Sequence, residues 1–273
     1  MIDIPDAISQ ARTLIDDKCF DEAISLLQEC EQACPGDEFV AAELAEAFSD
    51  RGYFSLQNNE PGAAQKDFES ALQFSPVPEA RLGLAQFAVV AGDFSRAQEL
   101  ADKILEDHPD FFPARELRAK ICITLGDSAG AEAEYRVILE EMAVPRVYLS
   151  LAALLKGQER EEEARGILFQ GLSSVPDDSD LVLAASRYAE PEERWQLLNN
   201  ALSVAPRSFE LWFERACAAC AGNDAEEAAI SLNHCLEIDP ERARSDWKAE
   251  LGREGSSTVP FADHPYLVDF REN

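Results

Sequence analysis

The sequence has 273 residues, with 53 acidic and 24 basic side chains and a formal net charge of −29. This charge argues against nucleic acid and anionic membrane surfaces as partners, because their phosphates attract Lys and Arg. No apolar run approaches the ~20 residues of a membrane span, the opening MIDIPDAISQ does not resemble a signal peptide, and the seven cysteines are typical of reduced thiols. We therefore expect a cytoplasmic protein.

The acidic charge is concentrated toward the amino-terminal end. Residues 1–78 carry 16 acidic and 4 basic side chains, whereas residues 79–143 carry 13 and 7. One interpretation is that this stretch attracts a basic partner segment over a long range. The alternative is that the acidic side chains keep the outer helical surface soluble.

One pattern of small and apolar residues recurs seven times along the chain. Its first instance is Ala23, Leu27, Cys30 and Pro35, and its last is Ala228, Leu232, Cys235 and Pro240. Spacings of four and three keep the first three residues on one helical face, and the Pro ends the helix. A fixed period of this kind predicts stacked supersecondary units. We expect two antiparallel helices in each unit, and thus an all-α solenoid forming one elongated domain.

The expected units follow the prolines along the chain. The predicted repeats span about 4–36, 37–77, 78–110, 111–144, 145–177, 178–207 and 208–240, with a capping helix over 241–251 and an irregular tail over 252–273. The interval before Pro76 is long, so the first helix of the second repeat should run from Glu38 to about Gln57 and protrude. The sixth repeat is short, with a first helix of about ten residues and a turn at 190–192. Gly92, Gly126 and Gly222 mark three of the other turns.

These residues resemble the tetratricopeptide repeat, whose 34-residue pattern is W-x2-L-G-x2-Y, then A-x3-F, then P. The first helices match it at Leu84, Ala85, Tyr148, Leu151, Ala152, Leu155, Trp212 and Ala216. The resemblance implies a right-handed solenoid of about seven repeats that binds proteins or peptides on its concave face. It does not extend to the members that clamp acidic carboxyl tails with Lys and Asn, because no Asn stands in the matching positions.

Two positions of the pattern carry structural expectations. The Gly position should hold a small residue wherever the two helices of a unit approach most closely, and it reads Ala11, Gly52, Ala85, Ala119, Ala152, Ala184 and Ala216. The position that usually holds Leu is instead Arg51, Arg118 and Arg215 in three repeats. We expect these arginines to lie between helices and reach neighbouring carboxylates, with the alternative that they grip an acidic ligand.

The capping helix and tail are expected to behave differently. Trp247 should be the buried contact of the capping helix, which covers the last repeat. The tail is rich in apolar residues, with docking candidates Phe261, Tyr266, Leu267 and Phe270. Either the tail folds back onto the solenoid, where residues 256–273 could block ligand binding, or it is presented to a partner as a linear motif.

The reactive side chains show no spacing in the sequence that is typical of a catalytic site. The three histidines share no spacing, and no phosphate-binding loop, nucleophile elbow or HExxH motif is present. Cys217, Cys220 and Cys235 allow a zinc or redox site as an alternative, but small residues on helices ordinarily serve packing. The sequence therefore predicts no enzyme activity, catalytic residue, cofactor or metal.

The remaining functional candidate is the concave surface formed by the first helices. The positions expected to face a ligand there are Tyr53, Leu56, Leu82, Gln86, Val89, Glu116, Lys120, Ile123, Leu149, Ala153, Phe213 and Cys217. Some of them are equally consistent with packing between neighbouring first helices. We predict a protein-interaction adaptor that binds a protein or peptide, with a basic segment favoured by the acidic end. A self-associating subunit or a chaperone-like accessory factor is the alternative.

Overall fold

The computed structural model describes residues 3–251, and all regular secondary structure in that range is helical. The described helices divide into two compact units at Tyr135/Arg136, inside α8 (Ser128–Glu141). Helices of unit 1 are α1 (Ile4–Asp16), α2 (Phe20–Ala33), α3 (Glu38–Gln57), α4 (Pro61–Phe74), α5 (Pro78–Val90), α6 (Phe94–Asp107) and α7 (Phe112–Leu125). Helices of unit 2 are α9 (Pro145–Gly157), α10 (Glu161–Ser174), α11 (Ser179–Ser186), α12 (Pro191–Val204), α13 (Phe209–Ala221), α14 (Ala225–Ile238) and α15 (Pro240–Leu251).

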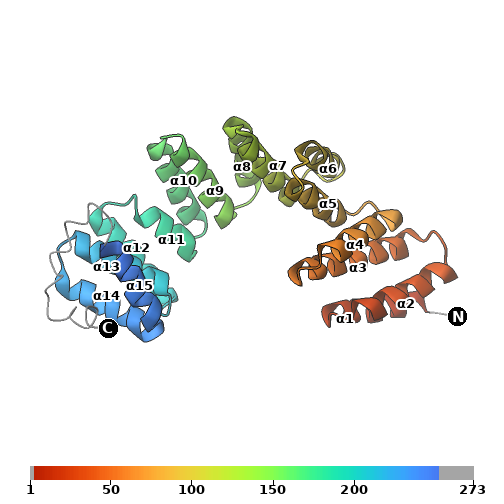
Figure 1. The fold of residues 1–273 in the computed structure, drawn as a ribbon, viewed down its shortest axis with the longest axis horizontal. Helices are drawn as coiled ribbons and strands as arrows, with labels where there is room; N and C mark the ends of the chain where they lie inside the picture. Colours follow the sequence, from red (N-terminus) through yellow and green to blue (C-terminus); the bar gives the residue numbers. More distant parts are fainter. Residues whose placement is uncertain (1–2, 252–273) are drawn as a thin grey trace. The chain divides into compact units, whose positions relative to one another are not determined.

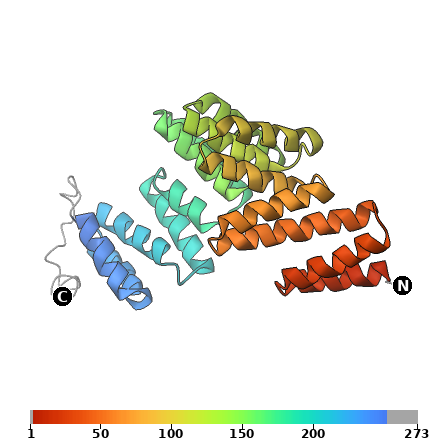
Figure 2. The same ribbon diagram turned by 45° about the vertical axis from the view of Figure 1, so that its right-hand side comes forward.

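Within each unit, consecutive helices form antiparallel pairs that stack on the next pair (Figure 1). The pairs are α1/α2, α3/α4 and α5/α6 in unit 1, and α9/α10, α11/α12 and α13/α14 in unit 2. Each of the seven predicted intervals contains one pair, and the fold is the all-α solenoid that the periodicity predicted. The twenty residues of α3 run alongside α4 in Figure 2, with the bounds that the sequence predicted.

Apart from the α11/α12 turn, the turns within the pairs share one backbone feature, a residue with positive φ directly before the N-cap of the second helix. These residues are Lys18, Asn59, Gly92, Gly126, Glu159 and Asn223, with φ between 61° and 80°. Gly92 and Gly126 meet the expectation, since Gly adopts this left-handed region without a steric penalty. The turn predicted at Gly222 and Asn223 is present, but the left-handed residue is Asn223 at 63°, whereas the φ of Gly222 is −78°.

A small residue lies eight positions after the N-cap of most first helices. It is Ala11, Ala85, Ala119, Ala152 and Ala216, all buried, while Gly52 occupies the matching place near the end of the longer α3. The prediction of Ala184 for the sixth pair was wrong. Ala184 is half-buried, and Ser186, fully buried, stands eight residues after the N-cap Asp178. α11 has eight residues instead of the expected ten, and the small residue lies two positions later than the sequence predicted.

The second pair shows why the small residue is required. The ring of Phe68 on α4 is fully buried between Gly52 on α3 and Gly83 on α5. A methyl group on Gly52 would lie 2.7 Å from Phe68 Cε1, and one on Gly83 would lie 2.5 Å from Phe68 Cε2. Both distances are shorter than carbon atoms tolerate. Tyr53 contacts the same ring edge-on, with ring centroids 5.0 Å apart, so Phe68 has no free space to move into.

Arg51, Arg118 and Arg215 each connect the second helices of two successive pairs. Arg51 binds Asp67 on α4 at 2.6 Å and Asp21 on α2 at 2.5 Å. Arg118 reaches Glu134 on α8 at 2.9 Å and Asp102 on α6 at 3.2 Å. Arg215 binds Glu227 on α14 at 2.8 Å and the amide oxygen of Asn199 on α12 at 2.9 Å. The predicted pairing of these arginines with carboxylates is confirmed.

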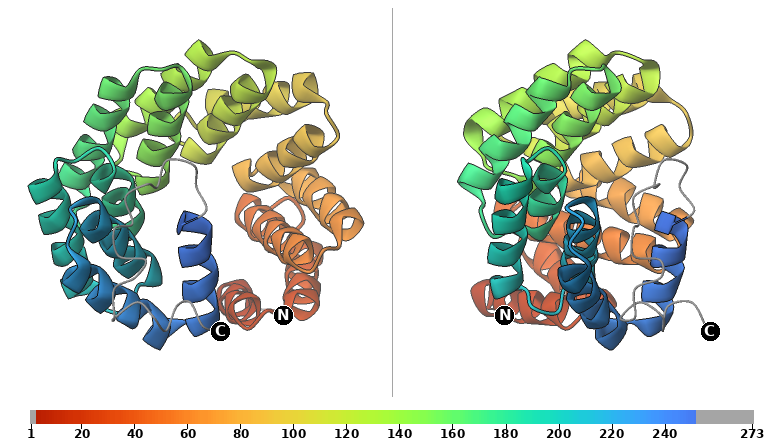
Figure 3. Two further views of the ribbon diagram at one scale, coloured as in Figure 1. Left: turned by 60° about the vertical axis from the view of Figure 1, so that its left-hand side comes forward. Right: turned by 90° about the vertical axis from the view of Figure 1, so that its left-hand side faces the viewer.

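The last described helix covers the end of unit 2, as predicted. Trp247 of α15 is 4% exposed and meets Phe213 of α13 edge-on, with ring centroids 6.4 Å apart. In Figure 3, α13, α14 and α15 are the blue helices at the end of the described chain. The predicted tail, residues 252–273, lies outside the described residues.

We expect Gly83→Ala to destabilise the protein by about 2 kcal/mol, because the methyl group must displace the buried Phe68 ring. Helix propensity alone would favour the alanine by ~1 kcal/mol. Gly166→Ala is the matched control, since Gly166 lies inside α10 and a methyl group there meets nothing within 4 Å. Urea unfolding followed by circular dichroism should show opposite signs for the two variants. Equal stabilisation would contradict this account of Phe68.

We expect Arg51→Leu to cost about 2 kcal/mol, because the Asp67 carboxylate, whose side chain is only 9% exposed, loses its charged partner. Replacing both residues, as Arg51→Leu with Asp67→Leu, should recover most of that loss, since no unpaired charge then remains buried. A double-mutant cycle in urea measures the coupling. Additive effects of the two changes would show that the ion pair is unimportant.

Candidate functional site

First helices of successive pairs contact one another and form a layer in each unit. The layer of unit 1 contains α1, α3, α5 and α7, and that of unit 2 contains α9, α11 and α13. Residues five, nine and twelve positions after the N-cap share one face of each helix, because they are spaced by four and three. We call this surface the first-helix face. In the longer α3 the matching residues are Ser49, Tyr53 and Leu56.

In unit 1, the predicted ligand residues differ in how open they are. Leu82 is buried, and the Tyr53 hydroxyl donates a hydrogen bond to the backbone oxygen of Glu79 at 2.9 Å. Ile123 is 44% exposed and Lys120 is also exposed. The remaining predicted residues there, Leu56, Gln86, Val89 and Glu116, are half-buried. The layer therefore brings these residues onto one face, where Ile123 is the most open apolar side chain of the set.

In unit 2, Leu149 and Phe213 occupy different surroundings. Leu149 is half-buried and lines a pocket. Phe213 stacks on Phe209 with ring centroids 5.9 Å apart and contacts Trp247, so it belongs to the core beneath α15. The tail candidates Phe261, Tyr266, Leu267 and Phe270 lie outside the described residues.

Sequence analysis missed a group of carboxylates on the first helices of unit 1. Asp16 on α1, Glu46 and Asp50 on α3 and Glu79 on α5 act electrostatically on one another. We call these four residues the acidic strip. The loss of hydration, followed by repulsion from Glu79, raises the pKa of Asp50 above its ordinary value. The same loss of hydration, with repulsion from Glu43, Glu79 and Asp50, raises the pKa of Glu46.

Tyr53 lies beside the acidic strip, which affects the ionisation of its hydroxyl. Burial raises the pKa of its hydroxyl to about 12, with additional repulsion from Glu79 and Asp50. The neutral phenol therefore persists at physiological pH. The sequence contained one indication of the acidic strip, because Glu46 and Asp50 are four residues apart on one helix. However, Asp16 and Glu79 come from other helices, so their proximity requires the fold.

A pocket of about 310 Å³ opens on the first-helix face of unit 2, between α9, α10 and α11. Its apolar lining consists of Leu149, Ala152, Ala153, Leu168 and Ala184. Its polar lining consists of Lys156, Glu161, Arg187 and Tyr188. The Arg187 side chain is 66% exposed and lies 3.4 Å from Glu214, whose other oxygen already binds Arg194 at 2.5 Å. Two cations thus border an apolar floor.

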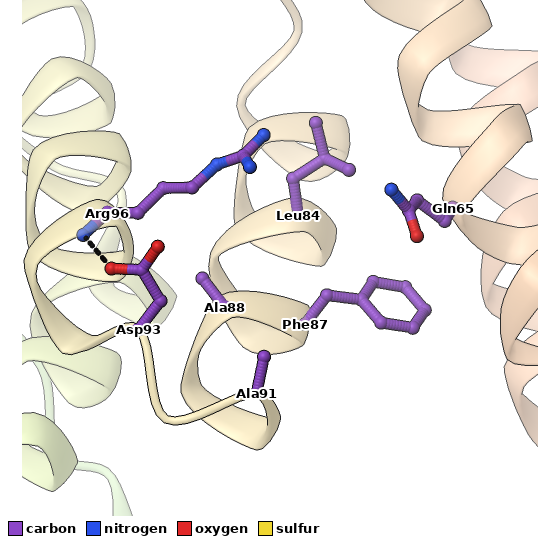
Figure 4. A pocket seen from close by; sticks show the side chains of 7 residues that line it. All are labelled: Gln65, Leu84, Phe87, Ala88, Ala91, Asp93 and Arg96. Carbon is purple, nitrogen blue, oxygen red and sulfur yellow. Dashed lines mark hydrogen bonds between the residues drawn. The ribbon is translucent and has the colours of Figure 1, made fainter.

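A smaller pocket of about 200 Å³ lies between α4, α5 and α6 of unit 1 (Figure 4). Phe87 extends from α5 toward Gln65 on α4, while Arg96 extends across from α6. The pocket's carboxylate belongs to Asp93, which accepts a hydrogen bond from the backbone N–H of Arg96 at 3.1 Å and caps α6. Because the Asp93 carboxylate is already used to cap α6, the pocket is better described as a crevice between helix pairs than as a reactive centre.

Two of the three cysteines considered for a metal or redox site, Cys220 and Cys235, are buried. Cys235 is buried, its thiol donates to the Phe209 backbone oxygen at 3.9 Å, and burial raises its pKa to about 12. A thiol held in the neutral form is a poor ligand and nucleophile. Among residues 3–251 the structure shows no group of three or more His, Cys, Asp or Glu side chains arranged to hold a metal. Within that same range no helix is long and apolar enough to cross a membrane.

Stacked helix pairs with a recurring buried small residue define a helical repeat protein. Residues 55–121 match the tetratricopeptide repeat family model. Most pairs on both sides of this match repeat the same small-residue position and turns, so the tetratricopeptide-repeat architecture continues outside the matched residues. No curated protein sequence shows a significant match.

Solved structures support the fold at low sequence identity. The C-terminal part of a tetratricopeptide-repeat protein from Cytophaga hutchinsonii has a TM-score of 0.59 at 14% identity, over 87% of this chain and 98% of that one. A tetratricopeptide-repeat protein from Parabacteroides merdae has a TM-score of 0.53 at 17% identity, over 89% of this chain and 97% of that one. PilF of Pseudomonas aeruginosa has a TM-score of 0.52 at 15% identity, over 90% of this chain and 96% of that one.

We expect Asp50→Asn to stabilise the protein near neutral pH. Because the pKa of Asp50 is raised in the folded state, folding binds protons between the unfolded and folded pKa values, and stability increases as the pH falls through that range. The neutral amide should remove the repulsion and flatten this pH dependence.

Asp110→Asn, at an exposed site before α7, is the matched control for net charge. Thermal unfolding of both variants across neutral and mildly acidic pH provides the measurement. An Asp50→Asn protein no more stable than the Asp110→Asn protein would contradict the predicted repulsion.

Proposed function

We propose that this protein is a non-enzymatic adaptor that holds a segment of another protein on the first-helix face of unit 1. The observation that carries the proposal is the acidic strip: burial, together with repulsion from neighbouring carboxylates that include Glu79, raises the pKa of Glu46 and Asp50, at a cost to the folded state. Perturbed groups of this kind gather at functional sites more often than elsewhere. Tetratricopeptide-repeat folds generally provide surfaces for protein partners.

The charge of the strip favours a basic partner segment. A Lys or Arg brought beside Asp50 and Glu79 would convert repulsion into attraction, so part of the electrostatic cost of folding would be returned on binding. Ile123 and the half-buried Leu56 and Val89 offer apolar contacts on the same face. Apolar contacts would supply affinity, while charge would speed the encounter and select the partner.

A reducing compartment fits the proposal. Among the described residues, Cys19 and Cys34 are exposed free thiols, and Cys122 is a partly exposed one. Thiols of this kind persist where glutathione and thioredoxin systems operate. We therefore assign the adaptor to the cytoplasm as part of this proposal.

The test compares stability with partner capture in the same variants. Affinity capture from the native cell should recover fewer partners with Asp50→Asn plus Glu79→Gln, although these changes stabilise the free protein. A loss of binding together with a gain in stability distinguishes a binding site from a structural cluster. Unchanged capture by this stabilised variant would refute the acidic strip as the docking surface.

A second comparison tests the apolar contact. Ile123→Asp should reduce capture of the same partners by about tenfold, because a partly buried apolar side chain contributes on the order of 1–2 kcal/mol on binding. Leu125→Asp is the matched control, since Leu125 is 59% exposed on the same helix but lies outside the first-helix face. Equal losses with both variants would contradict the assigned face.

A further inference from the structure

We propose that residues 261–270 of this same chain bind in the pocket between α9, α10 and α11 of unit 2. The segment reads FADHPYLVDF and lies outside the described residues. The proposal goes beyond the adaptor function, which concerns unit 1, and it assigns an occupant to a second surface.

The pocket combines an apolar floor with positive charge. Leu149, Ala153 and Leu168 form part of the floor, and Lys156 and Arg187 stand at its border. Lys156 makes no ion pair within the described part of the chain. Arg187 shares Glu214 with Arg194, which holds that carboxylate at the shorter distance of 2.5 Å. The guanidinium and the ammonium therefore retain donors for a further carboxylate.

One acidic residue also lines the pocket, and its charge is partly compensated. Glu161 lies in the first turn of α10, where the helix dipole is positive. The border therefore keeps a positive balance in a chain whose formal net charge is −29. A ligand that presents apolar side chains beside a carboxylate fits this arrangement.

Residues 261–270 have that chemistry. Asp269 stands between Val268 and Phe270, and Leu267 and Tyr266 precede them. Asp269 can meet Lys156 or Arg187 while a neighbouring apolar side chain enters the floor of the pocket. Charge complementarity therefore favours this segment over a basic peptide, which Lys156 and Arg187 would repel.

The length of chain after α15 allows the contact. Trp247 of α15 packs on Phe213 of α13, and α13 contacts α11, so the pocket begins one first helix beyond the covered end of unit 2. Neighbouring helices lie about 8–10 Å apart. The nine residues between Leu251 and residue 261 give ten Cα–Cα steps, which span up to ~35 Å when extended. A tethered segment of this kind acts at an effective concentration on the order of millimolar.

The experiment uses the full chain with p-benzoylphenylalanine in place of Leu267. Irradiation of dilute protein, followed by digestion and mass spectrometry, should give intramolecular cross-links to Pro145–Gly157, to Glu161–Ser174 or to residues 179–188. The same photoreactive residue in place of Thr258 is the matched control and should not cross-link to these helices. Cross-links from position 267 to other regions, or none, would overturn the proposal.

A charge swap tests the chemistry of the contact. Lys156→Glu with Arg187→Glu should lower the cross-link yield by about fivefold, because two exposed ion pairs are replaced by repulsion. Adding Asp269→Lys to that protein should restore the yield. A yield insensitive to these changes would refute the ion pairs, and cross-linked dimers whose yield rises with protein concentration would assign the segment to a second copy. No partner and no residue of unit 1 enters the measurement, so it is independent of the adaptor proposal.

Discussion

The close approach of neighbouring helices at one buried small residue is the constraint on which the rest of the structure depends. In the second pair, glycines on both sides of Phe68 leave no room for a single methyl group. The fifth pair uses the reverse arrangement, with Gly171 of α10 against Tyr148 of α9. Because large and small side chains interlock in this way, the orientation of each first helix is fixed. The orientation of the first-helix face is consequently set by packing on the opposite side of the same helix.

Charge plays different roles on the two sides of the first-helix layer. Arg51 and Arg118 extend toward the second helices and pair with carboxylates of two successive pairs, while Arg215 joins a carboxylate of one pair to the Asn199 amide of the other, so these charges join the repeats together. The acidic strip, in contrast, brings Asp50 close to Glu79 without an intervening cation. The charges that join the repeats and the charges of the acidic strip therefore lie on separate surfaces. This separation allows the outward charges to vary without loss of the contacts that hold the solenoid together.

Local patterns predicted the parts of this structure that depend on neighbouring residues. Helix pairs, the long α3 and the pairing of Arg51 follow from periodicity and from the need to satisfy a buried charge. The error at Ala184 arose where α11 is short, and the left-handed residue of the turn predicted at Gly222 and Asn223 is the asparagine. The acidic strip needs three helices to assemble, and Phe213 is covered only because α15 folds over it. Such features depend on tertiary contacts that spacing alone does not encode.

The eight-residue α11 has a mechanical consequence for unit 2. Each pair in a linear array is stabilised by its immediate neighbours, and α11, with eight residues against twelve or more in every other described helix, offers its neighbours the shortest contact. Its turn into α12 also lacks the left-handed residue found in the other described turns. When the chain is pulled from its ends, rupture should begin there and leave α13–α15 folded as a separate block. The sixth pair is thus the part of unit 2 that should unfold first under tension.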